Sequence, residues 1–204
     1  MASVPARLVD ELIRDGAAAL LKQHGYRKRG RHFTKDNAQS SSSIAFRASV
    51  WNGTGTARFT IDLASHFPAL ELPLGTSSYG QMITRLSGSI CTGIGSLVGG
   101  EPSLWWAASP PADPAQCAAD VGDTLANHAL PWLESVSTLH GLAAHGRYLP
   151  LSRFLPSPEP CLAAASALAA IGRQAEAIAL FAEYQAMPGH SRDIEQGWLP
   201  KYGA

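Results

Sequence analysis

The hydrophobic pattern at the start of the chain has the period of a helix. Apolar residues recur at three- and four-residue intervals from Val4 to Leu21, which places them on one face of a helix. Ser3 can cap the first turn, Pro5 suits that turn, and Gly25 stands where a helix typically ends. The pattern therefore predicts an amphipathic helix that ends before Gly25.

The period then changes to two, as expected for strands that have one buried face. Apolar and polar residues alternate in residues 31–35, 43–51 and 56–66. A further strand is predicted at residues 90–97, within a segment that mixes glycine with Ile90, Ile94, Leu97 and Val98. The sequence thus indicates an antiparallel sheet of about four strands.

Asn52-Gly53 between the second and third strands favours a tight hairpin. If the turn centres on Gly53 and Thr54, Phe46 lies opposite Ile61 and apolar residues meet on one face. That apolar face is predicted to contain Ile44, Phe46, Ala48, Val50, Phe59, Ile61 and Leu63. The opposite face, here named the polar sheet face, is the predicted binding surface and carries Arg47, Ser49, Trp51, Arg58, Thr60 and Asp62.

Helical patterns return in the second half of the chain. Asp113-Pro114 has the form of a cap and first turn, and predicts a helix over residues 113–128. Pro131 is expected to interrupt this helix and open a second one. Two short helices, over residues 161–171 and 174–186, are predicted to form a hairpin. The fold class is therefore α+β, with the sheet packed by the N-terminal helix and the following helix pair.

Proline-rich sequence divides this pattern into four parts. An α+β domain is expected at 1–146, a connector at 147–160, a helical hairpin at 161–187 and a tail at 188–204. The hairpin resembles one tetratricopeptide-type helix pair, but a single copy cannot form a solenoid. It is therefore interpreted as a helical hairpin docked on the main domain.

Composition excludes several classes of function. The 204 residues include sixteen Lys and Arg against sixteen Asp and Glu, so no overall field favours nucleic acid or an anionic membrane. The three cysteines form no metal or disulfide pattern, and no secretory signal or membrane-spanning stretch is evident. A cytoplasmic protein without membrane contact is predicted, and charged residues at 16%, against about 25% in typical domains, weakly favour a protein partner.

Candidate chemistry is sparse. The seven histidines lack metal-ligand spacing, and no serine or cysteine has the surroundings of a nucleophile. The glycines of residues 93–99 lack the spacing and the following helix of a dinucleotide loop. We therefore expect no metal, no cofactor and no catalytic residue, although an enzyme stays open as an alternative.

One basic patch stands out after the first helix, namely Arg27, Lys28, Arg29 and Arg31. Cations are favourable at the C-terminus of a helix for electrostatic reasons alone. A solvated or partner-facing patch is therefore the preferred interpretation, and phosphate contacts with nucleic acid are the alternative.

Several short motifs occur in an order typical of one family. They are Leu-Lys-Gln-His-Gly-Tyr-Arg-Lys-Arg-Gly-Arg-His-Phe at 21–33, the strands at 44–51 and 58–63, Trp105-Trp106, and Leu-Pro-Trp-Leu at 130–133. Over about residues 5–140 the chain resembles the bacterial family filed as domain of unknown function 4304, although Gly93 replaces a residue that is often basic there. The resemblance implies an α+β fold and a bacterial cytoplasmic origin, and it carries no catalytic residues.

The leading functional hypothesis is a non-enzymatic protein-binding module, of an immunity or antitoxin type that neutralises a bacterial toxin or effector. Trp51 with Arg47 and Arg58 would anchor that interface. One alternative is an enzyme or small-ligand protein with a pocket between the polar sheet face and Trp105-Trp106. The other is a nucleic-acid adaptor that uses residues 27–31.

Overall fold

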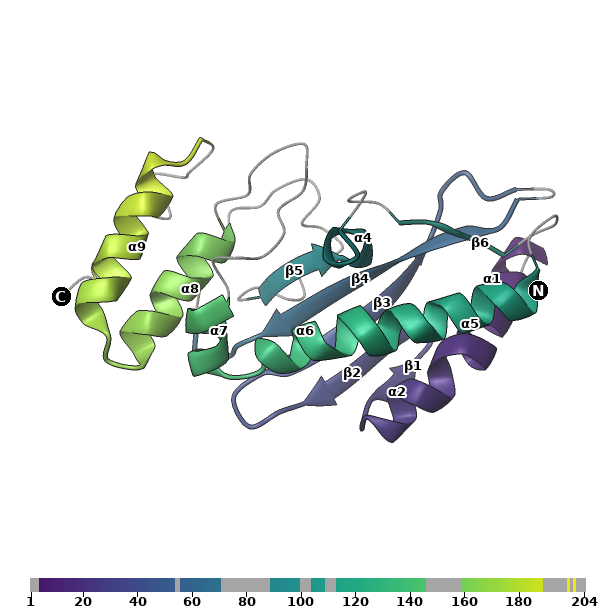
Figure 1. Cartoon of the computed structure of the whole chain (residues 1–204), viewed down its shortest axis with the longest axis horizontal. Helices are drawn as coiled ribbons and strands as arrows, with labels where there is room; N and C mark the ends of the chain where they lie inside the picture. Colours follow the sequence, from purple (N-terminus) through teal and green to yellow (C-terminus); the bar gives the residue numbers. More distant parts are fainter. Residues whose placement is uncertain are drawn as a thin grey trace. The chain divides into compact units, whose positions relative to one another are not determined.

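The computed structural model describes residues 4–53, 56–70, 89–99, 104–108, 113–145 and 159–188, together with Trp198 and Pro200 (Figure 1). The chain forms two compact units. Unit 1 contains Met1–Lys35, Ser42–Leu63 and Thr92–Leu133, and unit 2 contains Asp36–Ser41, Ala64–Cys91 and Glu134–Ala204. Helices and an antiparallel sheet combine as the predicted α+β fold.

The sheet has six strands in the order β1-β2-β3-β4-β5, with β6 paired to β4. The strands are β1 (Arg27–Arg29), β2 (His32–Asp36), β3 (Ser41–Ala48), β4 (Arg58–His66), β5 (Ser89–Gly93) and β6 (Trp106–Ala107). The first three predicted strands correspond to β2, β3 and β4 and are confirmed. Strands β1 and β6 were not predicted, because each has too few residues to show a period.

The fourth predicted strand is only half correct. Strand β5 ends at Gly93, and residues 94–97 form the short helix α4 (Ile94–Leu97). Ile94 is fully buried in the core of unit 1, so its apolar character reflects helix packing and not strand alternation. In a segment of only four residues, the periodicity of apolar positions does not distinguish a strand from a helix.

The first helix spans the predicted residues and ends as expected. It consists of α1 (Val4–Ile13), a π-helical turn at Arg14–Ala18 and α2 (Ala19–Gln23). Gly25 has φ +84°, a left-handed conformation that glycine adopts without steric cost. The π turn was not predicted, because hydrophobic periodicity does not resolve one inserted residue.

The helix after Asp113 also begins as predicted, but it continues through Pro131. Asp113 Oδ1 accepts a hydrogen bond from Ala115 N–H at 2.9 Å, which caps α5 (Pro114–Thr124). A π-helical turn at Leu125–Ala129 then leads into α6 (Leu130–Ser135). The predicted interruption at Pro131 is therefore wrong, because a widened turn upstream accommodates a proline that has no N–H to donate.

Aromatic rings on neighbouring strands form the core of unit 1. Phe33, Phe46, Phe59 and Trp106 follow one another across β2, β3, β4 and β6, with ring centroids 5.7, 6.1 and 5.7 Å apart. Buried residues of α1, α2 and α5 complete this cluster. Figure 1 shows α5 along the sheet with α1 and α2 beside it, so these helices cover one sheet face.

Unit 2 contains α7 (Leu139–His145) and the predicted helical hairpin, α8 (Glu159–Ala170) and α9 (Gln174–Ala186). All side chains of α8 from Cys161 to Ala167 are buried, as expected for a helix that is apolar on every side. Trp198 stacks on Phe181 at 4.0 Å and donates its indole N–H to Ser166 Oγ at 2.8 Å. Most of the predicted connector and tail lie outside the described residues.

Candidate functional site

The hairpin that joins β3 and β4 keeps the predicted pairing at its base. Ser49 N–H donates to the Arg58 carbonyl oxygen at 2.9 Å, which is the bond that the predicted register requires. Phe59 is fully buried and Arg58 is exposed. The predicted assignment of these two side chains to opposite faces is therefore confirmed.

Nearer its tip the hairpin contains a bulge that was not predicted. Gly53 pairs with Thr56 in an isolated bridge, so three residues of the first strand lie opposite Ala57 alone. Extra residues in one strand leave the hydrogen-bonded ladder and bend the chain. Val50 and Trp51 are consequently 90% and 86% exposed. The prediction that Val50 joins the apolar face is wrong, and Trp51 lies at the tip beyond the end of β3.

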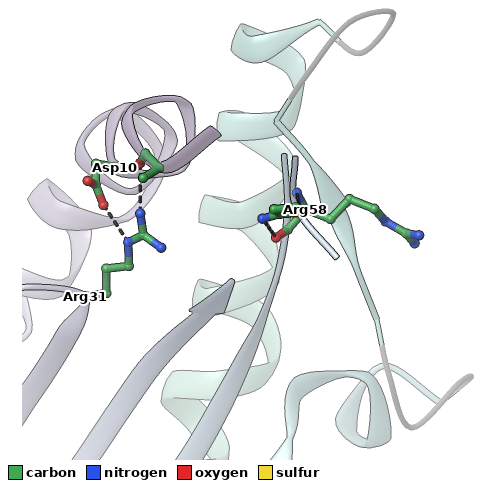
Figure 2. A network of polar contacts seen from close by, with 5 residues as sticks. Asp10, Arg31 and Arg58 are labelled. Atoms are coloured by element: carbon green, nitrogen blue, oxygen red, sulfur yellow. Dashed lines mark hydrogen bonds and ion pairs between the residues drawn. The ribbon is translucent and has the colours of Figure 1, made fainter. Parts of the chain in front are cut away.

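The side chain of Asn52 holds this bulge in place. Its Oδ1 accepts from Arg58 N–H and its Nδ2 donates to the Arg58 carbonyl oxygen, both at 2.8 Å. Trp51 N–H donates to Ser49 Oγ at 3.2 Å. Figure 2 shows the backbone of Arg58 bonded in this way while its side chain extends away from the ribbon. The bulge is therefore an ordered feature of the hairpin.

Trp105 lies on the polar sheet face between two arginines. Arg58 pairs with Ala107 across β4 and β6, and continuing this register brings Trp105 beside Thr60. The guanidinium carbons of Arg47 and Arg58 each lie 5.8 Å from the centroid of the Trp105 ring, a cation–π distance. Thr60 is only 3% exposed and is therefore not available to a partner, contrary to the prediction.

The two arginines differ in their carboxylate contacts. Arg47 forms a bidentate ion pair with Asp62, with Nε–Oδ2 at 2.7 Å and Nη2–Oδ1 at 3.2 Å. These side chains are 36% and 38% exposed, so the pair contributes at most about 1 kcal/mol to stability. Arg58 has no ion pair with any residue that the structure describes. No carboxylate of the described residues therefore compensates its positive charge at Trp105.

The predicted basic patch separates into three environments. Lys28 pairs with Phe33 across β1 and β2, and its Nζ lies 5.7 Å from the Phe33 ring centroid. Since side chains alternate along a strand, Arg27 and Arg29 lie on the polar sheet face, where both are exposed. The two arginines of β1 therefore extend the polar sheet face toward its edge.

Arg31 has a structural role in the first helix. Its Nε donates to Asp10 Oδ1 at 2.6 Å and its Nη2 donates to the Ala6 carbonyl oxygen at 2.8 Å. Figure 2 shows the Arg31 side chain directed at α1. Arg31 therefore connects the β1–β2 turn to the helix and does not belong to the candidate surface.

Charge in unit 1 is segregated between its sheet and its helices, although the whole chain has no net charge. The strands and turns of the sheet carry Arg27, Lys28, Arg29, Arg31, Lys35, Arg47 and Arg58 against Asp62 and Asp36, the last residue of β2. The helices carry Asp10, Glu11, Asp15, Asp120 and Asp123 against Arg7, Arg14 and Lys22. Overall composition conceals this asymmetry, which appears only when the elements are assigned.

A depression of about 590 Å³ lies elsewhere in unit 1, between the first helix and α5. It is lined by Asp15, Gly16, Leu20, Ala115, Ala118, Ala119, Gly122, Asp123 and Ala126. None of these residues belongs to the polar sheet face, so this hollow does not provide the pocket beside Trp105 that an enzyme or small-ligand function would require. The described residues contain no cluster of three metal-ligating side chains.

Comparison with known proteins identifies one family. The family model described as Domain of unknown function (DUF4304) matches residues 17–135, more than half of the chain. The matched segment includes every element that builds the polar sheet face. No curated protein and no solved structure matches this chain. Within the described residues, no helix is long and apolar enough to cross a membrane.

Proposed function

The chain belongs to the DUF4304 family, whose description assigns no function, and we propose from its own residues that it is a non-enzymatic protein-binding module. The hairpin tip and the polar sheet face form the binding surface. Val50 and Trp51 are its apolar anchors, and Arg47 and Arg58 with Trp105 form its polar part. Trp and Arg are the residue types most enriched among energetically dominant interface residues.

The bulge between β3 and β4 is the observation that supports this proposal. It places two large apolar side chains in water, at 90% and 86% exposure, and the Asn52 hydrogen bonds hold them there. Exposed apolar side chains contribute nothing to the core of unit 1. A partner that buries them would gain about 25 cal/mol per Å² of apolar area.

We further propose that the partner is a toxin or effector protein that this chain neutralises by covering its active surface, as an immunity protein or antitoxin does. A module of this kind needs a rigid surface and no catalytic group. Trp105 contacts the guanidinium groups of Arg47 and Arg58, and Asp62 holds Arg47 in place. These contacts provide such a surface. This part of the proposal concerns the identity of the partner and is tested separately.

The first test is affinity capture at physiological salt from a nuclease-treated lysate of the source organism. The wild type should retain one protein in a stoichiometric amount, and the Val50→Ala/Trp51→Ala double variant should lose it. Val98→Ala, which removes a 43% exposed apolar side chain elsewhere in unit 1, is the matched control and should retain the partner. Equal retention by the double variant would overturn the proposed surface.

The neutralisation step has its own readout. The captured protein is expressed alone and together with this chain in a heterologous bacterium, and growth is recorded. Growth should stop with the partner alone and resume with the wild-type chain but not with the double variant. Unimpaired growth with the partner alone would rule out neutralisation and leave the binding function intact.

A further inference from the structure

We infer that the partner surface is acidic and that one of its carboxylate side chains binds Arg58 beside Trp105. This inference rests on the proposed protein-binding function and adds the chemistry of the partner. It is carried by the arrangement of charges on the polar sheet face, which is independent of the apolar tip.

Two cationic side chains converge on one indole ring, and among the described residues a carboxylate pairs with Arg47 but none with Arg58. Arg47 and Arg58 are each 5.8 Å from the Trp105 ring centroid, and Asp62 binds Arg47 in a bidentate pair. Bringing like charges together has an electrostatic cost. A second carboxylate, supplied by a partner, would bind Arg58 as Asp62 binds Arg47 and would offset that repulsion.

The surrounding charges favour the same kind of partner. Arg27 and Arg29 are exposed on the polar sheet face at the edge strand β1. Among the described strands this face carries two acidic residues, Asp62, which Arg47 neutralises, and Asp36 at the end of β2, against the four arginines Arg27, Arg29, Arg47 and Arg58. Complementary charge of this kind raises the association rate and excludes basic partners.

A single-stranded nucleic acid fits this surface less well than an acidic protein. Proteins that bind single strands stack successive bases on several exposed aromatic rings. Trp51 is the one strongly exposed aromatic side chain among the described residues. Trp105 is half-buried and already contacts two guanidinium groups. The surface thus offers carboxylate binding and lacks a row of rings for stacking.

Titration of the full chain with a short poly-L-glutamate peptide, followed by isothermal calorimetry, tests the inference. The wild type should bind, and raising the salt from low to physiological concentration should weaken binding. Arg58→Ala should reduce the affinity about tenfold or more, since it removes a charge-assisted hydrogen bond. Arg173→Ala, which removes an exposed arginine ion-paired with Glu176, should leave the affinity unchanged.

Three results would overturn the inference. The first is that the poly-L-glutamate peptide does not bind, or that Arg58→Ala and Arg173→Ala lose the same affinity for it. The second is tighter binding of an oligothymidylate of the same length, which would indicate nucleic acid. The third is concentration-dependent self-association in sedimentation that Arg58→Glu abolishes, which would indicate a second copy of the chain.

The captured partner distinguishes failure of this inference from failure of the proposed function. If its binding is lost in the Val50→Ala/Trp51→Ala variant but is insensitive to both salt and Arg58→Glu, the protein-binding function stands and the acidic-partner inference is wrong. If neither set of variants changes the capture, both are wrong.

Discussion

Individual side chains show where alternation along the sequence predicts the structure and where it does not. Phe59 and Arg58 lie on the predicted faces because both belong to a regular strand. Val50 continues the same alternation in the sequence but is 90% exposed. The difference arises from the Asn52 side chain, whose two bonds to Arg58 replace backbone pairing. Such side-chain hydrogen bonds leave no periodic signal.

The different burial of Phe59 and Arg58 should appear as a difference in the free energy of unfolding when each is replaced by alanine. Phe59→Ala should lower the free energy of unfolding by about 3–5 kcal/mol, because it leaves a cavity between the rings of Phe46 and Trp106. Arg58→Ala should change it by no more than about 0.5 kcal/mol, since the side chain is exposed. Urea denaturation monitored by circular dichroism measures both. Similar losses for the two variants would show that the faces are assigned incorrectly.

The three cysteine thiols should differ in their reaction with a maleimide. Cys91 is exposed and Cys161 is buried. Burial raises the pKa of the half-buried Cys117 thiol, and Asp120 raises that pKa further. Because the thiolate is the reactive form, a raised pKa leaves less of it at neutral pH.

We therefore expect Cys91 to be labelled first, Cys117 more slowly, and Cys161 only after unfolding. The rate at Cys117 should continue to rise at alkaline pH beyond the range where an ordinary cysteine has levelled off. Mass spectrometry of peptides after timed labelling gives all three rates. Labelling of Cys117 as fast as Cys91 at neutral pH would contradict its burial.

At the level of helices and strands, the sequence predicts which elements form better than it predicts where they begin and end. The helix that ends before Gly25 and the helix that begins after Asp113 are marked by these flanking residues, and both helices are observed. The π-helical turns and the helical state of residues 94–97 depend on packing against other elements. Local composition cannot encode contacts with distant parts of the chain, so these features were missed.

One close approach between helices gives a direct test. Gly16 faces α5, where an added Cβ would overlap the Ala118 carbonyl oxygen, and a Cβ at Gly122 would lie 2.9 Å from the Gly16 carbonyl oxygen. Alanine in a helix is normally more stable than glycine. Gly16→Ala should nevertheless lower the free energy of unfolding by about 1–3 kcal/mol, because the helices must separate.

Gly53→Ala is the control for this substitution, since a methyl carbon added at Gly53 would meet no atom within 4 Å. It should change stability by no more than about 0.5 kcal/mol. Thermal or urea unfolding of both variants is sufficient. A stabilised Gly16→Ala variant would show that the two helices are not in contact at this point.

For the whole molecule, the zero net charge is misleading as a guide to partners. Acidic residues outnumber basic ones on the helices of unit 1 and basic residues outnumber acidic ones on its sheet, so a sum over the whole chain conceals the sign of each surface. The polar sheet face was predicted from alternation alone. Trp105, Asn52 and the edge arginines were not assigned to it, because their positions depend on the pairing of β6, the bulge and strand β1.

The affinity of the captured partner for the hairpin tip tests the central claim most directly. Calorimetry with the purified partner should show at least about a tenfold weaker affinity for Val50→Ala/Trp51→Ala, as expected when dominant interface residues are truncated. Val98→Ala should bind like the wild type. Equal affinities for all three proteins would contradict the claim that the exposed tip of the β3–β4 hairpin is the binding surface.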